Sequence, residues 1–161
     1  MVIKHASRKD IAALTAVETA CFPPAQAATE KEFIDRVQYY GNHFWLLYEG
    51  DKLLAFVDGF VTDEPDLTDV MYEDAALHNE NGAWQMIFGV NTLPEYRKRG
   101  HACELIRRAI ADARQQGRKG LVLTCKERLL PYYAKFGFQD EGVTDKSTHG
   151  NVAWHQMRLS F

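Results

Sequence analysis

Apolar residues near the start of the chain recur every three or four positions and predict two helices. The first opens at Ser7, whose side chain can form a capping box with Asp10, and it ends at the proline pair 23–24. The second opens at Thr29, where Glu32 supplies the same capping signal three residues later. Two helices in a row therefore follow a short β-prone segment at the start of the chain.

Two apolar and aromatic runs, residues 44–49 and 53–61, predict an antiparallel hairpin that turns at Gly50. The stretch that follows, residues 62–82, is acidic and has no clear periodicity. Loops of this length in a small domain are often functional, so both a substrate lid and a plain surface excursion fit this segment.

The second half of the chain alternates strand and helix signals. Residues 84–92 predict a strand, residues 100–116 an amphipathic helix that ends at Gly117, and residues 119–125 a buried strand. A short helix at residues 127–135 and a final antiparallel pair at residues 136–141 and 152–159 complete the pattern.

These elements together predict an α/β fold. Strand, glycine loop, helix and strand in succession form a βαβ unit, whose two strands are expected to be parallel neighbours. With the antiparallel segments, this gives a mixed, twisted sheet of about six to seven strands with helices on both faces. A chain of 161 residues fits one domain spanning residues 1–161.

Composition narrows the function classes. The net charge of -3 lacks the basic excess of a nucleic-acid-binding domain, so no nucleic-acid partner is expected. The three cysteines, Cys21, Cys103 and Cys125, match no zinc spacing and favour reduced thiols; no metal site is expected. No signal peptide or membrane-length apolar run is visible, which predicts a cytoplasmic protein without a membrane partner.

A basic, glycine-containing loop joins the central strand to the amphipathic helix. Its residues are Arg97, Lys98, Arg99, Gly100, His101 and Ala102. A helix N-terminus presents backbone N–H groups and a positive dipole end, which suits phosphate binding. The loop matches neither a Walker A motif nor a dinucleotide fingerprint. A basic turn that only caps the helix explains the same residues.

Two segments together resemble a known family. Residues 90–102, VNTLPEYRKRGHA, resemble the acetyl-CoA motif of the GNAT N-acetyltransferases, and residues 130–138, LPYYAKFGF, resemble the second GNAT signature. One helix and one strand separate the two, as in the family. The resemblance implies a GNAT fold over nearly the whole chain and acetyl-CoA as cosubstrate.

Further residues are similar to the serotonin (arylalkylamine) N-acetyltransferases, in a bacterial-type form. They are residues 20–29, ACFPPAQAAT, and 124–127, TCKE, which lead into the second signature. That group carries two histidines on the strand before the phosphate loop. This chain has Met86 and Phe88 at the matching positions, and neither accepts a proton.

The family resemblance implies specific roles. Backbone groups of Val90, Asn91 and Thr92 would hold acetyl-pantetheine in a gap beside the strand that ends at Cys125. The amides of the basic loop would bind the diphosphate. Tyr133 would protonate the leaving thiolate, although a helix aromatic that packs the core explains it as well.

The general base is an open question. Only a neutral amine attacks a thioester, so a base or a water relay must take the proton. His149, in a turn before the last strand, is one candidate, and a solvated or structural histidine is the alternative. The others are Asp69, Glu73, Asp74, His78 and His155.

Three functions fit these residues. The first is acetyl transfer by direct attack of a small primary amine, arylalkylamine-like or polyamine. The second is a protein or peptide N-acetyltransferase, and the third is a CoA-binding module without catalysis. A homodimer is compatible with the resemblance, since the last strands of relatives often pair between subunits.

Overall fold

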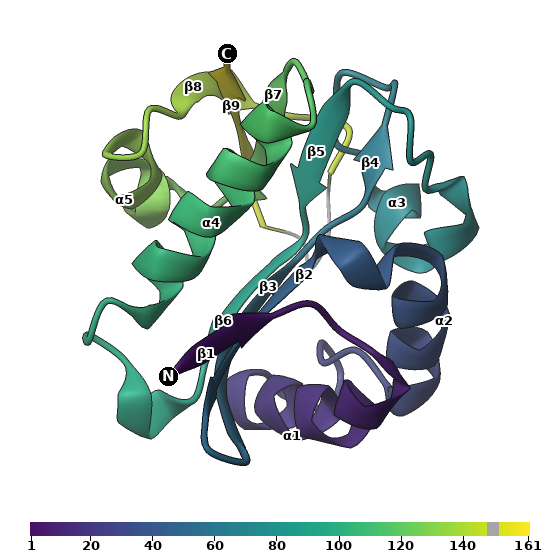
Figure 1. Ribbon diagram of the computed structural model, residues 1–161. Helices are drawn as coiled ribbons and strands as arrows, with labels where there is room; N and C mark the ends of the chain where they lie inside the picture. The colour runs from purple at the N-terminus through teal and green to yellow at the C-terminus, as the bar shows by residue number, and fades with distance from the viewer. Residues whose placement is uncertain (148–151) are drawn as a thin grey trace. The chain divides into compact units, whose positions relative to one another are not determined.

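The computed structural model describes residues 1–147 and 152–161 (Figure 1). The chain forms two compact units, and each takes segments from both halves of the sequence. The first unit comprises residues 1–59 and 89–109, and the second comprises residues 60–88 and 110–161. Within the described residues, no helix combines the length and apolar character needed to cross a membrane.

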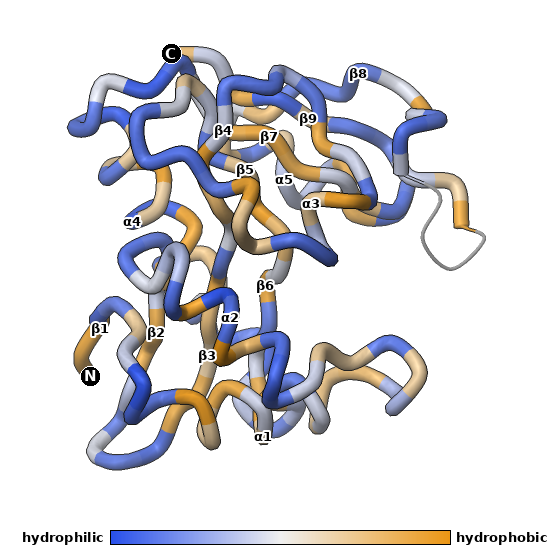
Figure 2. Tube along the Cα trace, turned by 90° about the vertical axis from the view of Figure 1, so that its right-hand side faces the viewer, coloured by the Kyte–Doolittle hydropathy of each residue, from blue (hydrophilic) through white to orange (hydrophobic). Residues whose placement is uncertain are grey.

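The first unit contains a four-stranded antiparallel sheet. Its order is β1 (Val2–Lys4), β2 (Phe44–Glu49), β3 (Lys52–Asp58) and β6 (Gly89–Thr92). The predicted hairpin is confirmed, because β2 and β3 pair directly and Gly50 adopts the left-handed φ of 58° that the tight turn requires. The strand β3 is the apolar centre of this sheet, as its orange residues show (Figure 2).

Two helices pack together in the first unit, and both predicted capping boxes are present. A 3-10 turn (Arg8–Asp10) with the Ser7–Asp10 box leads into α1 (Ile11–Cys21), and Thr29 with Glu32 opens α2 (Glu30–Tyr40). The helix α1 packs against α2, β3 and β6. Fully buried residues of this core include Leu14, Phe33, Phe44, Leu46, Leu54 and Phe56.

The second unit contains a mixed sheet of five strands. Its order is β4 (Val61–Thr62), β5 (Trp84–Ile87), β7 (Gly120–Cys125), β9 (His155–Ser160) and β8 (Gln139–Val143). The strands β5 and β7 are parallel, as the predicted βαβ unit requires, and the final antiparallel pair is β8 with β9. The helices α4 (His101–Gln115) and α5 (Leu130–Ala134) lie at their predicted places in the sequence.

The mixed α/β class is confirmed, but two predicted strands each divide between the sheets. The expected strand at residues 84–92 breaks at Phe88, so β5 pairs with β4 and β7 while β6 pairs with β3. The expected strand at residues 53–61 likewise ends at Asp58, before Gly59. The described residues therefore form nine strands in two hydrogen-bonded sheets, where about six to seven strands in one were expected.

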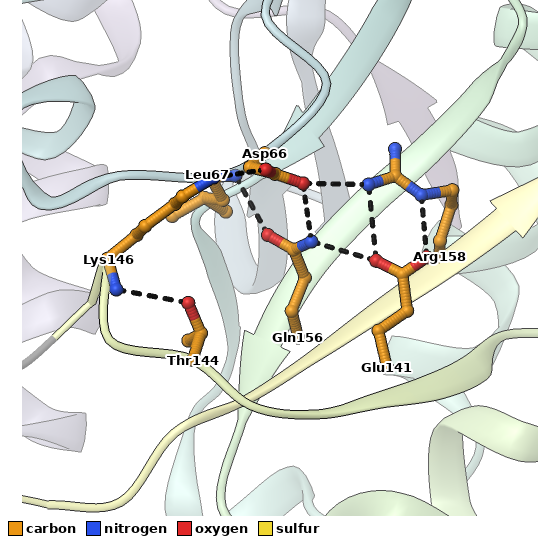
Figure 3. A network of polar contacts seen from close by, with 7 residues as sticks. All are labelled: Asp66, Leu67, Glu141, Thr144, Lys146, Gln156 and Arg158. Carbon is orange, nitrogen blue, oxygen red and sulfur yellow. Dashed lines mark hydrogen bonds and ion pairs between the residues drawn. The ribbon is translucent and has the colours of Figure 1, made fainter.

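The acidic excursion after β4 is structured. It contains α3 (Asp69–Glu73) and a 3-10 turn (Ala75–Leu77). A polar network ties its start to β8 and β9 (Figure 3). Arg158 pairs with Asp66 at 3.0 Å and with Glu141 at 2.9 Å, and the Gln156 side chain accepts a hydrogen bond from the Leu67 amide at 3.0 Å. These contacts give the excursion a fixed start, whether or not it acts as a lid.

The Thr29 cap provides a test of this local structure. The Glu32 amide donates to the Thr29 hydroxyl at 3.2 Å, so Thr29→Ala should lower the free energy of unfolding by about 1 kcal/mol. Urea unfolding followed by circular dichroism measures this difference. Thr19→Ala is the control, because the exposed Thr19 hydroxyl bonds to the Thr15 carbonyl within α1 and caps no helix start. Its loss should change stability by less than about 0.5 kcal/mol. Equal losses in both variants would contradict the capping role.

Candidate active site

Among the described residues, one edge of β6 has no strand partner, because β6 is the last strand of its sheet. The Leu93 amide donates to the Leu54 carbonyl at 2.9 Å, which continues the antiparallel ladder between β6 and β3. Residues alternate along such a ladder, so the amide and carbonyl of Val90 and of Thr92 point away from β3. This edge offers hydrogen-bonding groups to an extended ligand.

The chain then turns sharply toward α4. After a 3-10 turn (Pro94–Tyr96), Lys98 has a φ of 64° and Gly100 a φ of 82°. The Arg97 side chain is folded back, and its Nε donates to the Thr92 carbonyl at 3.2 Å. Two left-handed residues so close together reverse the chain within a few positions, and a non-glycine such as Lys98 is strained there.

The start of α4 has the features of an anion site. The first intrahelical bond runs from the Glu104 amide to the Gly100 carbonyl, so the helix has no internal acceptor for the amides of its first turn. Those amides and the helix dipole favour negative charge. A Cβ built on Gly100 would meet nothing within 4 Å, so the backbone there is open to close approach. Arg97, Lys98 and Arg99 are exposed beside it.

His101 occupies the first position of α4 and differs from the basic residues before it. It is only 9% exposed, and its Nε2 atom is buried with no hydrogen-bond partner in the part of the chain that the structure describes. Ala102, the next residue, is half-buried and small. The structure thus brings the predicted residues 97–102 together as one loop and helix start, in the same unit as β6.

A buried carboxylate supports β6 from the helical side. Glu18 on α1 accepts hydrogen bonds from the Asn91 side chain at 3.1 Å and from the Ala28 amide at 2.9 Å. Burial raises the pKa of Glu18, and these two bonds oppose the rise. Glu18 therefore links the strand of the site to the segment that precedes α2. The predicted role of Asn91 rested on its backbone, which the ladder turns toward β3, and its side chain bonds to Glu18.

The predicted acid lies in the second unit. Tyr133 on α5 is 7% exposed, and its ring contacts Phe138 edge-on at 6.1 Å. Burial raises the pKa of its hydroxyl, and the nearby Cys125 and Tyr72 raise it further. A phenol in this setting keeps its proton well above neutral pH, which a proton donor requires.

An aromatic series lies in the same unit. The Phe88 ring is 4.9 Å from both the Phe60 ring and the Tyr72 ring, and the Tyr72 hydroxyl lies 3.3 Å from the Thr124 hydroxyl. Tyr72 and Phe88 are only half-buried, so their rings have surface left for a ligand. Met86, by contrast, is fully buried in β5.

The thiols of Cys21 and Cys125 are not activated as nucleophiles. Cys21 donates to the Thr92 carbonyl at 3.3 Å, and burial raises its pKa. Burial and Asp140 raise the pKa of Cys125 to about 11, and its thiol contacts the Met157 sulfur at 3.6 Å. Both thiols stay protonated near neutral pH, whereas a thiolate is the nucleophilic form.

The structure places most of the other candidate bases in structural contacts. His78 accepts from the Val61 amide at 3.0 Å through Nδ1, and its Nε2 lies 3.1 Å from Glu80. His155 lies 3.0 Å from Asp140, Asp69 accepts from the Ser147 hydroxyl at 2.9 Å, and Asp74 accepts from the Ala76 amide at 3.1 Å. Glu73 is exposed at the end of α3. His149 lies outside the described residues.

Sequence reasoning did not find the buried polar cluster of the first unit. Its members are Glu18, Arg36, Tyr40, Asp58 and Asn91. One signal was present, since Glu18 falls four positions after Leu14 on the apolar face of α1. A charged residue on such a face is either paired or functional.

Residues 11–138 match the profile described as the acetyltransferase (GNAT) family. Serotonin N-acetyltransferase of Mesocricetus auratus is 30% identical over 114 residues, which cover 70% of this chain and 53% of that enzyme. The matched part of the chain thus spans about half the length of this curated relative.

Solved structures share the fold. The loading GNATL domain of CurA from Lyngbya majuscula superposes with a TM-score of 0.84 at 18% identity, covering 99% of this chain and 96% of that one. A GNAT family acetyltransferase from Brucella melitensis, solved in complex with acetyl-CoA, gives a TM-score of 0.63 at 20% identity over 99% and 87%.

Proposed function

Because the chain belongs to the acetyltransferase (GNAT) family, and so to the acetyl-CoA-dependent transferases, we propose that its acceptor is a small primary amine with an aromatic group. The observation that carries this proposal is the aromatic series of Phe60, Phe88 and Tyr72, which ends at the Tyr72–Thr124 hydroxyl contact. Half-buried rings favour an aryl or alkyl portion, and the hydroxyls favour a polar end. The similarity to serotonin N-acetyltransferase supports the same acceptor class.

The first unit supplies the groups for acetyl-CoA. The outward amide and carbonyl of Val90 and the outward amide of Thr92 suit the amide groups of pantetheine, because an extended chain pairs with a free strand edge. The open backbone at Gly100 and the first amides of α4 suit the diphosphate. An amide at the strand edge would also stabilise the oxyanion that develops during attack.

The chemistry proposed is direct transfer without an acyl-enzyme. An acyl-enzyme on cysteine needs a thiolate, and Cys21 and Cys125 both have raised pKa values. The amine nitrogen would therefore attack the thioester carbon itself. The C–N bond forms, the C–S bond breaks, and the sulfur of CoA leaves as a thiolate that takes the proton of Tyr133.

A protein or peptide acceptor and a CoA-binding module are the competing functions. Thiol release from acetyl-CoA, measured with 2-phenylethylamine, propylamine, spermidine and a short peptide with a free N-terminus, separates them. We expect kcat/KM for 2-phenylethylamine to exceed that for propylamine at least about tenfold, a difference of about 1.4 kcal/mol. Turnover of the peptide alone would favour a protein acceptor, and acetyl-CoA binding without turnover would favour a module.

The phosphate-loop assignment is tested by Gly100→Glu. The new side chain points into open space, so the fold should survive, while its charge and bulk should lower acetyl-CoA affinity more than tenfold, about 1.4 kcal/mol. Isothermal titration calorimetry with acetyl-CoA measures the loss. Gly50→Glu is the matched control, since Gly50 also has a left-handed φ and open surroundings but lies in the β2–β3 turn. A Gly100→Glu affinity within tenfold of wild type would refute the assignment.

The role of Tyr133 is tested by its phenylalanine variant. Loss of the proton donor should lower kcat about 10²-fold while acetyl-CoA affinity changes by less than about tenfold. Steady-state thiol release and calorimetry measure the two quantities. Tyr132→Phe, the neighbouring half-buried tyrosine, is the control and should retain wild-type kcat. An unchanged kcat in Tyr133→Phe would remove that hydroxyl from the mechanism.

A further inference from the structure

Four elements of the first unit enclose a cluster of polar side chains. Glu18 comes from α1, Arg36 and Tyr40 from α2, Asp58 from the end of β3, and Asn91 from β6. Arg36 Nη1 lies 3.9 Å from Asp58 Oδ2, and the Tyr40 hydroxyl bonds to the Asp58 carboxyl. Glu18 bonds to Asn91, as described above. These contacts form two sets, and the sets interact through charge, because Glu18 and Arg36 both change the pKa of Asp58.

The cluster contains two carboxyls and one guanidinium, so it has one more acidic group than basic groups. Asp58 is 1% exposed and Glu18 is 8% exposed, and both face the single guanidinium of Arg36. Two buried carboxylates beside one cation leave an uncompensated charge if both ionise, which is costly in a low dielectric. One carboxyl is therefore expected to lose its proton at a higher pH than an exposed carboxyl does. A buried acid with this property can exchange a proton near neutral pH.

Two buried acceptor atoms in the cluster, Asp58 Oδ2 and Asn91 Oδ1, receive no hydrogen bond from the described residues. Arg36 Nη1, at 3.9 Å from Asp58 Oδ2, is beyond hydrogen-bond distance. Such atoms are rare in folded proteins, and a functional role is one of the few reasons for their retention. Both atoms are acceptors, so the group that would satisfy them is a proton donor.

Asp58 also lies directly beside the strand that carries the candidate site. It pairs with Gly89 across the β3–β6 ladder, and paired residues in such a ladder share one face of the sheet. A Cβ on Gly89 would lie 2.7 Å from Asp58 Oδ1 and 3.3 Å from the Asn91 amide nitrogen. The absent side chain of Gly89 thus lets the carboxyl reach the β6 backbone, one residue before the outward amide of Val90.

We propose that the Asp58 carboxylate is the acceptor of the proton that the substrate amine must lose, with Glu18 and Asn91 as its positioning residues. This inference rests on the proposed acetyl transfer. It answers the question left by Met86 and Phe88, which occupy the positions where the related arylalkylamine enzymes carry histidines.

The proton balance of the step is simple. An N–H bond of the ammonium ion breaks, its electron pair stays on nitrogen, and an O–H bond forms on Asp58, directly or through one water molecule. The neutral amine then attacks the thioester carbon and loses its second proton as the amide forms. Tyr133 gives its proton to the CoA thiolate, and the second amine proton, passed on through water, restores the Tyr133 hydroxyl. Asp58 afterwards gives its proton to solvent, so each turnover releases one proton.

The charges around Asp58 determine the direction in which its pKa should move in each variant. Burial raises the pKa of Asp58 to about 7, Arg36 opposes this rise, and Glu18 adds to it. Tyr40 donates a hydrogen bond that lowers the same pKa. A base works in its ionised form, so the rate should rise with pH through this region. Removing the charge of Glu18 should lower the pKa of Asp58 and move the rise to lower pH.

The experiment is the pH profile of kcat/KM for 2-phenylethylamine with the full chain, for wild type, Asp58→Asn, Glu18→Gln and Asp35→Asn. Wild type should show an acidic limb near pH 7. Asp58→Asn should lose this limb and about 10²-fold in kcat/KM at pH 7, with acetyl-CoA affinity within tenfold of wild type. Glu18→Gln should keep the limb but shift it to lower pH. Asp35→Asn neutralises an exposed carboxylate on α2 and should leave the limb in place.

Each outcome decides the inference. A wild-type limb in Asp58→Asn, or a limb in Glu18→Gln that does not move or moves to higher pH, would overturn it. If Asp58→Asn does not fold, the direction of the Glu18→Gln shift decides alone, since a purely structural role would not move a titration. Wild-type protein that releases no CoA with any amine would overturn the proposed function and this inference together. Release by wild type with unaltered profiles in both variants would overturn only the inference.

Discussion

The unpaired edge of β6 is the constraint on which the rest of the candidate site depends. The strand β6 pairs with β3 on one side only. The amides and carbonyls on its opposite side therefore need other partners. The break at Phe88 creates this situation, because it separates β6 from β5, whose own two neighbours are strands. The proposed binding of acetyl-CoA through backbone groups depends on that pairing pattern rather than on any particular side chain.

Such an edge must be held in place by contacts on its face. The α1 side of β6 provides them through Glu18, which bonds both to Asn91 and to the Ala28 amide. Buried polar contacts of this kind are directional, so they fix the position of a strand more narrowly than apolar packing does. Burial also raises the pKa of Glu18 and of Asp58. The buried carboxyls around β6 are therefore both contacts that position the strand and groups suited to proton exchange.

Local sequence was sufficient where the interaction itself is local. The capping boxes at Ser7 and Thr29 join residues three positions apart, and the turn at Gly50 needs only a left-handed residue. The loop before α4 could likewise be predicted from the sequence, since its glycine and its basic residues are consecutive in the chain. The division of two strands could not be predicted, because an apolar run does not indicate which partner strand each of its halves will pair with.

The sequence by itself determined the order of helices and strands, the basic loop at the start of α4 and the family to which the chain is similar, since each depends on residues close together in the chain. Only the tertiary structure decided that Glu18, Arg36, Asp58 and Asn91 meet, that Tyr72 reaches Thr124, and that Val90 turns its amide to a free edge. The physical reason is that burial, pKa and strand pairing are properties of neighbours in space, and those neighbours come from distant segments of the chain.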